Sequence, residues 1–136
     1  MIDLIIFDLD GVLADSEPIA FRVVAETVTA AGVPITTADM FHYVGSSPRD
    51  MYSDMERQSG VKLPPDIVPR VAAGILAAFR DELTPMPGVL EMLGNLDVRR
   101  AVASNGSLNR VLGAIDILGL TEYFAPHIYS ADLVAA

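Results

Sequence analysis

The sequence predicts an α/β protein in which a parallel sheet is interrupted, after its first strand, by an all-helical insertion. Three observations support this fold class. A short apolar run over residues 4–7 ends at an acidic turn, residues 17–83 show helical patterns without a strand pattern, and strands and helices alternate from Pro85 onward. Hydrophobic periodicity separates the element types, and such alternation is typical of a parallel sheet.

The first predicted strand, residues 4–7, is rich in branched and aromatic residues and is typical of a buried parallel strand. Burying an acid inside it would be costly, so we expect Asp8 and Asp10 at its open carboxyl end. Side chains two positions apart in an extended segment point the same way, so both carboxylates serve one site unless the turn after Asp8 rotates the second. Two carboxylates this close repel each other, and a bound cation commonly offsets the repulsion.

The insertion is expected to contain four helices. Gly32 is placed to end the first of them. Ser47 is a capping residue, and Pro48 stands at the first helical position of the third. The predicted helices span residues 17–31, 36–44, 48–60 and 64–83. The expected buried face of the last helix carries Val68, Val71, Ala72, Ile75, Phe79 and Leu83.

The remaining chain predicts the other sheet elements, with helices over 87–96 and 107–118 and strands over 100–103 and 127–130. Ser104 ends the second strand as Asp8 follows the first. Ligands of parallel sheets bind outside the carboxyl ends of strands, so the two residues meet if their strands are neighbours. The Ser104 hydroxyl, the Asn105 amide and the backbone N–H groups of the turn would then suit phosphate oxygens near a helix N-terminus. On its own, this turn is a common strand-to-helix connection.

Composition excludes several classes of function. The 136-residue chain is 51% hydrophobic with a formal net charge of −9, which is typical of a globular protein and unsuited to a nucleic-acid surface. No apolar stretch is long enough to span a membrane, and the acidic N-terminus is unlike a signal peptide. The absence of cysteine excludes disulfides, thiolate zinc sites and a cysteine nucleophile. We therefore expect a soluble, cytoplasmic protein without nucleic-acid or membrane partners, whose chemistry depends on carboxylates and hydroxyls.

Residues 7–17, Phe-Asp-Leu-Asp-Gly-Val-Leu-Ala-Asp-Ser-Glu, resemble the first motif of haloacid dehalogenase-type phosphohydrolases, in the branch that holds β-phosphoglucomutase and phosphoglycolate phosphatase-like enzymes. The resemblance implies an incomplete Rossmann-like core over residues 1–15 and 85–136, with an all-helical cap domain over 16–84.

The same resemblance implies roles for individual residues. Asp8 would be the nucleophile that becomes an aspartyl-phosphate, and Asp10 would protonate the leaving oxygen and then deprotonate water. The two aspartates would also hold Mg²⁺. Residues expected to bind the substrate or its phosphate are Leu9, Ser104, Asn105 and Arg49.

Two cap residues have alternative interpretations. Arg49 follows a segment that resembles the substrate-specificity loop of this branch and would reach a second anionic group of the substrate. It is equally typical of a solvated arginine at a helix start. Glu17 would gate the cap or simply favour the N-terminus of its helix.

The chain departs from the family near its end. The family's third motif is a lysine and its fourth an acidic pair, but the only lysine is Lys62, in the cap segment, and no acid follows Asp132. We therefore expect an N-terminal portion of a longer enzyme, truncated before the third motif and nearly inactive by itself. Its first strand would carry an unpaired edge, which favours self-association.

The expected reaction is magnesium-dependent hydrolysis of a small phosphorylated metabolite, such as a sugar phosphate, through an aspartyl-phosphate. Dehalogenation fits less well, because a halide leaves without a proton whereas an alkoxide needs the one that Asp10 would supply. A β-phosphoglucomutase-type phosphotransferase and a catalytically deficient fragment are the alternatives.

Overall fold

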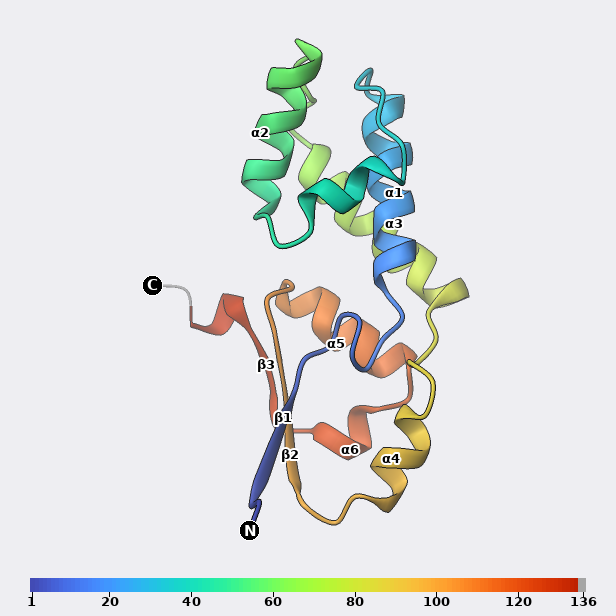
Figure 1. The fold of residues 1–136 in the computed structure, drawn as a ribbon, viewed down its shortest axis with the longest axis vertical. Helices are drawn as coiled ribbons and strands as arrows, with labels where there is room; N and C mark the ends of the chain where they lie inside the picture. Colours follow the sequence, from blue (N-terminus) through green and yellow to red (C-terminus); the bar gives the residue numbers. More distant parts are fainter. Residues whose placement is uncertain (135–136) are drawn as a thin grey trace. The chain divides into compact units, whose positions relative to one another are not determined.

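The computed structural model describes residues 1–134 and divides the chain into two compact units (Figure 1). The first unit joins Met1–Glu17 to Ala78–Ala136, and the second is Pro18–Ala77. The domain bounds expected from the sequence, 1–15 with 85–136 and 16–84, stay a prediction.

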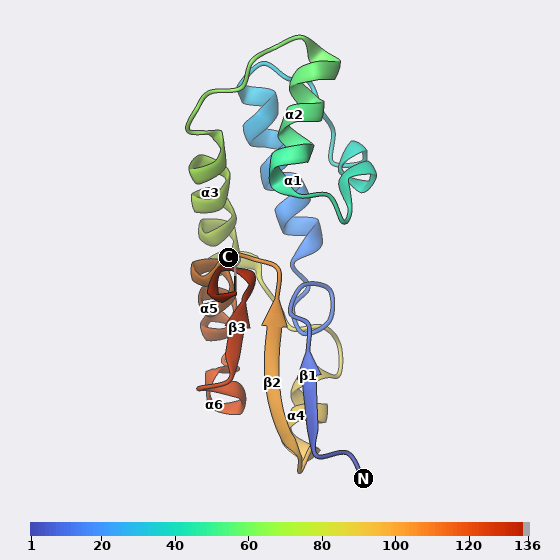
Figure 2. The same ribbon diagram turned by 90° about the vertical axis from the view of Figure 1, so that its left-hand side faces the viewer.

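Over the described residues, the first unit contains a three-stranded parallel sheet in the order β1-β2-β3 (Figure 2). Pairing sets Phe7 opposite Val102, and Ser104 opposite Ser130. The carboxyl ends of all three strands therefore meet at one edge, and the predicted α/β class is confirmed. The strands are β1 (Leu4–Phe7), β2 (Arg99–Ser104) and β3 (Ile128–Ser130).

Within residues 1–134, helices cover one face of this sheet and leave side chains on the other face exposed. Figure 1 shows α4 (Val89–Asn95), α5 (Leu108–Ile117) and α6 (Thr121–Phe124) on the same side of the sheet. On the open face the side chains of Leu4 and Ile6 are 48% and 62% exposed. The apolar pattern of β1 is typical of burial on both faces, but in the part of the chain that the structure describes these three helices pack on the opposite face only.

The core of the first unit lies between the sheet and its helices. The ring of Phe7 meets the ring of Phe124 edge to face, with centroids 5.8 Å apart. Val102 from β2 and Val111 and Ile115 from α5 are fully buried. Removing this apolar surface from water fixes α5 against the strands, and α5 begins at the edge where the strands end.

Two short helical turns have no counterpart in the sequence-based prediction. They are α6 and the 3-10 turn η2 (Ala131–Leu133). Each is too short to show a helical repeat of apolar residues. The second is capped by the Ser130 hydroxyl, which accepts a hydrogen bond from the Asp132 N–H at 3.1 Å.

The second unit is all-helical over its described residues, as the sequence predicts. The Ser47 hydroxyl accepts a hydrogen bond from the Asp50 N–H, and Gly60 ends the same helix with φ of 71°. None of the helices described in either unit is long and apolar enough to cross a membrane. The helices are α1 (Glu17–Ala30), η1 (Asp39–Tyr43), α2 (Pro48–Ser59) and α3 (Ile67–Glu82).

The predicted start and apolar face of α3 need correction. The helix begins at Ile67 rather than at Pro64, because the two adjacent prolines lack N–H groups and hold the preceding chain extended. Ile67 is buried, whereas Val68 is 52% exposed and Ala72 is exposed. The buried side chains are Ile67, Val71, Ile75, Phe79 and Leu83.

Candidate active site

The turn after β1 presents two aspartates in different surroundings. The strand ends at Phe7, and the carbonyl of Leu9 accepts hydrogen bonds from three N–H groups further along the chain, which closes a tight turn. Asp8 is exposed, and its Oδ1 accepts a hydrogen bond from the Leu9 N–H at 2.7 Å. The chain therefore does not stay extended from Asp8 to Asp10, which is the exception that the sequence left open, and a shared site for the two carboxylates stays a prediction.

Asp10 is held by two donors on one oxygen. The Ser16 hydroxyl donates to Asp10 Oδ1 at 2.6 Å, and Arg110 Nη2 donates to the same atom at 2.8 Å. Ser16 is fully buried, and the side chains of Asp10 and Arg110 are each 27% exposed. Such partly buried, charge-assisted bonds fix the direction of the carboxylate. The other oxygen, Oδ2, is left for further contacts.

Ser104 ends β2, the strand beside β1, and shapes the turn that follows. Its hydroxyl oxygen accepts a hydrogen bond from the Gly106 N–H at 3.1 Å, and the residue is 8% exposed. On the other side of the turn, the Ser130 hydroxyl donates to the Gly106 carbonyl at 2.7 Å. Hydroxyls from β2 and β3 thus hold this turn at the carboxyl edge of the sheet.

Helix α5 begins directly after this turn, and its first N–H groups are partly occupied. The Ser107 hydroxyl accepts from the Arg110 N–H at 3.4 Å, so Ser107 caps the helix as predicted. The carboxylate of Asp132 accepts from the Leu108 N–H at 2.8 Å. An acid at this position complements the positive end of the helix dipole.

The remaining residues expected to bind substrate lie in different places. The Leu9 side chain is fully buried, so only its backbone is available to a ligand. Asn105 is exposed in the turn after β2, at the same edge as Asp8. Arg49 is exposed on α2 in the second unit. The binding roles of all three stay predictions.

Arg110 was missed by the sequence reasoning, which assigned no basic side chain to this edge of the sheet. Its side chain comes from the first turn of α5, and Asp10 lies 100 positions earlier in the chain. The available signal was its place three residues after the capping Ser107, beside the predicted phosphate turn. The periodicity of apolar residues could not reveal the contact between Arg110 and Asp10, because this contact depends on how α5 packs against the turn after β1.

The donors at this edge are oxygens, which is the ligand type that Mg²⁺ prefers. Asp8 offers an exposed carboxylate, whereas the Asp10 Oδ1 already accepts from Ser16 and Arg110. Within residues 1–134, no three acidic, histidine or cysteine side chains are grouped closely enough to hold a metal ion. The residues present therefore fit Mg²⁺ in kind but supply few ligands.

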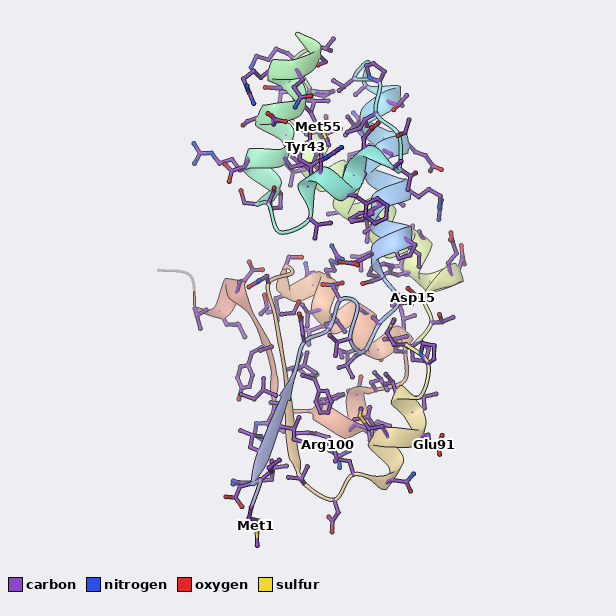
Figure 3. The ribbon with its side chains drawn as sticks, in the orientation of Figure 1. Met1, Asp15, Tyr43, Met55, Glu91 and Arg100 are labelled. Atoms are coloured by element: carbon purple, nitrogen blue, oxygen red, sulfur yellow. The ribbon has the colours of Figure 1, made fainter. Side chains whose placement is uncertain are left out.

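The second unit has a separate cavity of about 500 Å³, lined by residues that include Tyr43 and Met55 (Figure 3). The Tyr43 hydroxyl donates to Asp54 at 3.0 Å. This bond lowers the pKa of Asp54, with Arg57 and Gln58 adding to the effect. Burial, followed by the bond to Asp54, raises the pKa of Tyr43. The contact links η1 to α2 and places a hydrogen-bonded hydroxyl and carboxylate in the wall of the cavity.

Comparison with known proteins gives three informative relatives. Residues 5–136 match the profile of the haloacid dehalogenase-like hydrolases. A phosphoglycolate phosphatase of Agrobacterium fabrum is 32% identical over 130 residues, covering 90% of this chain and 56% of that protein. The crystal structure of a haloacid dehalogenase-like protein of unknown function from Agrobacterium tumefaciens has a TM-score of 0.84 and 34% identity, covering 100% of this chain and 62% of the other.

The third relative is a hydrolase of the same family from Deinococcus radiodurans, solved with bound phosphate and sodium. Its TM-score is 0.71 with 27% identity, covering 97% of this chain and 58% of that one. The chain thus spans less than two thirds of the length of each of these relatives.

Proposed function

The chain belongs to the haloacid dehalogenase-like hydrolase family, and we propose that the protein hydrolyses small phosphate monoesters. In this proposal Asp8 is the nucleophile and Asp10 the acid and base. The observation that carries it is the turn after β1, where an exposed carboxylate is followed by one that Ser16 and Arg110 hold in place. The name of the Agrobacterium fabrum relative and the phosphate bound to the Deinococcus relative agree with this reaction class.

The proposed reaction has two steps. A carboxylate oxygen of Asp8 attacks the phosphorus of the ester, and the bond from phosphorus to the leaving oxygen breaks while Asp10 gives that oxygen its proton. Asp10, now a carboxylate, takes a proton from water as the water oxygen attacks the aspartyl-phosphate. The acyl phosphate bond breaks, inorganic phosphate leaves, and the Asp8 carboxylate is restored.

The residues around the two aspartates would position the phosphoryl group. Ser104 and the turn that it shapes lie at the carboxyl end of the neighbouring strand, where a hydroxyl and backbone N–H groups suit phosphate oxygens. Transfer of a phosphoryl group depends mainly on such positioning and on stabilisation of charge. The buried Ser16 hydroxyl keeps Asp10 oriented during both steps.

Mg²⁺ is part of the proposal, with Asp8 and the backbone next to it as the ligands that this chain offers. When bound, it would offset negative charge on the phosphoryl oxygens. Waters and substrate oxygens would complete a site with so few carboxylates. The substrate class is proposed to be small phosphorylated metabolites, with phosphoglycolate and sugar phosphates as the first candidates.

The test is Asp8→Asn in the full-length protein, assayed with a panel of phosphate esters and with beryllium fluoride as a phosphoryl mimic. We expect turnover to fall by about a thousandfold or more, because the amide is a poor nucleophile. The variant should also fail to retain beryllium fluoride. Asp3→Asn, the same change at the other end of β1, is the matched control and should keep full activity. Normal turnover by the Asp8 variant would refute the assignment.

A further inference from the structure

Arg110 is the cation that the fold places beside the acid and base of the proposed reaction. Its Nη2 lies 2.8 Å from Asp10 Oδ1, although the two residues are 100 positions apart in the chain. An arginine at the start of a helix is usually solvated, but the side chain of this one is only 27% exposed. The contact is therefore made by the packing of α5 against the turn after β1.

The guanidinium is also constrained on its opposite side. Its Cζ lies 5.5 Å from the centroid of the Phe79 ring, and Phe79, which belongs to the same unit, has no exposed surface. A cation over a buried aromatic face gains a favourable electrostatic contact. Arg110 is thus held between a fixed ring and a carboxylate.

One donor of this guanidinium is unpaired. The Nε atom of Arg110 is buried and has no hydrogen-bond partner among the described residues. A buried donor without an acceptor costs stability, so this arginine is not an optimised structural contact. Apolar residues would fill the same space with less penalty, which points to a role for the charge itself.

We propose that Arg110 is a positioning residue that holds the Asp10 carboxylate toward the reacting groups, with Phe79 as its support. The inference rests on the proposed function of Asp10. Arg110 and Ser16 both bind Oδ1, so they fix the plane of the carboxylate and leave Oδ2 to carry the transferred proton. Without Arg110, the Ser16 hydroxyl alone would have to orient the group.

The kinetic test uses Arg110→Gln and Arg110→Lys in the full-length protein. Misplacing a reacting group by about 1 Å costs on the order of a hundredfold in rate, so kcat of the Gln variant should fall by roughly 10- to 100-fold while KM changes little. The loss should be larger for alkyl phosphates than for aryl phosphates, because alkoxides depend more on proton donation. Lysine should restore part of kcat. Asn109→Ala, in the same turn of α5, is the matched control and should keep wild-type kcat.

A second measurement does not depend on activity. In ¹⁵N-labelled protein, the Nε–Hε resonance of Arg110 should shift and lose protection from exchange in Asp10→Asn. It should stay in place in Asp132→Asn, the same change at a carboxylate that also contacts the start of α5 but not Arg110.

The outcomes separate the two proposals. If the resonance responds to Asp10→Asn but the wild-type protein hydrolyses no phosphate ester, the proposed function fails and the Arg110–Asp10 contact stands. If the protein is active and Arg110→Gln raises KM with unchanged kcat, Arg110 binds substrate and the positioning role is wrong. An unchanged resonance in Asp10→Asn would overturn the contact itself.

Discussion

The hydroxyls of Ser104 and Ser130 both bind the backbone of Gly106, so variants of the two serines can separate a role in phosphate binding from a role in stability. Ser104→Ala removes a hydroxyl proposed to hold a phosphate oxygen, and it also frees the Gly106 N–H. Loss of one preorganised donor costs on the order of a hundredfold in rate, so kcat/KM should fall by about that factor. Ser130→Ala removes the hydroxyl bound to the carbonyl of the same glycine. It should lower the melting temperature with little change in kcat/KM, and equal kinetic losses in both variants would contradict a role for Ser104 in phosphate binding.

Arg49 carries the prediction on substrate selectivity. If it contacts a second anionic group, Arg49→Ala should reduce kcat/KM about tenfold for substrates with an additional carboxylate or phosphate, and little for simple phosphate esters. Arg70→Ala removes another exposed arginine of the second unit, which is paired with Asp66, and serves as the control. An unchanged ranking of substrates in Arg49→Ala would show that this arginine is only a solvated residue at the helix start.

The site residues differ in how far the sequence could predict them. Asp8 and Asp10 follow β1, and Ser104 is the last residue of β2. These positions could be predicted because strand ends can be identified from apolar runs. Arg110 and Ser16 act through contacts that depend on a tight turn and on the packing of α5. The sequence left open whether Asp8 and Asp10 share an extended segment or are separated by a turn, and the Leu9 carbonyl closes such a turn between them.

At the level of elements, the contact between η1 and α2 should make the stability of the protein depend on pH. The bond from Tyr43 holds the folded-state pKa of Asp54 below its usual 3.8. The stabilisation is therefore complete above about pH 4 and is lost as pH falls through the lowered pKa. The pKa of Tyr43 is raised above its usual 10.0, so its contribution is present below pH 10 and is lost as pH rises further.

Tyr43→Phe tests this contact. The variant should melt at a lower temperature near neutral pH. It should also lose less stability than the wild type on acidification below pH 4, because Asp54 gains less from ionisation when only Arg57 and Gln58 still lower its pKa. Tyr52→Phe is the matched control, since Tyr52 is buried and its raised pKa comes from burial alone. Tyr52→Phe should change how stability depends on pH above about pH 10, and it should leave the loss of stability below pH 4 as in the wild type. Thermal unfolding followed by circular dichroism from pH 2 to pH 11 provides the measurement.

For the whole molecule, the pattern of the sequence predicted the fold class and most of the helices. The helix starts at Ser47 and Ser107 were found because side-chain capping is a local interaction. The buried face of α3 was found in part: Val71, Ile75, Phe79 and Leu83 are buried as predicted, whereas at the start of the helix Ile67 rather than Val68 is buried. The apolar pattern of β1 did not show which of its faces is covered in the described residues, because coverage of a sheet face is a property of the assembled molecule and not of the strand.

The open face of the sheet leads to the prediction that this chain self-associates in solution. Leu4, Ile6 and Tyr129 are 48%, 62% and 48% exposed, and β1 is an edge strand of the described sheet. An exposed apolar edge strand favours pairing with another copy. The formal net charge of −9 opposes this pairing, so association should strengthen when added salt screens the repulsion.

Sedimentation velocity over a range of concentrations would measure this association, with Ile6→Lys as the disrupting variant. The lysine should reduce association at small cost to folding, because the replaced side chain is already mostly exposed and a charge on an edge strand discourages pairing. Leu112→Lys makes the same change of charge at a 44% exposed leucine of α5, and it should associate as the wild type does. A wild-type chain that stays monomeric at all concentrations, or an equal effect of both lysines, would show that the open face is not an interaction surface.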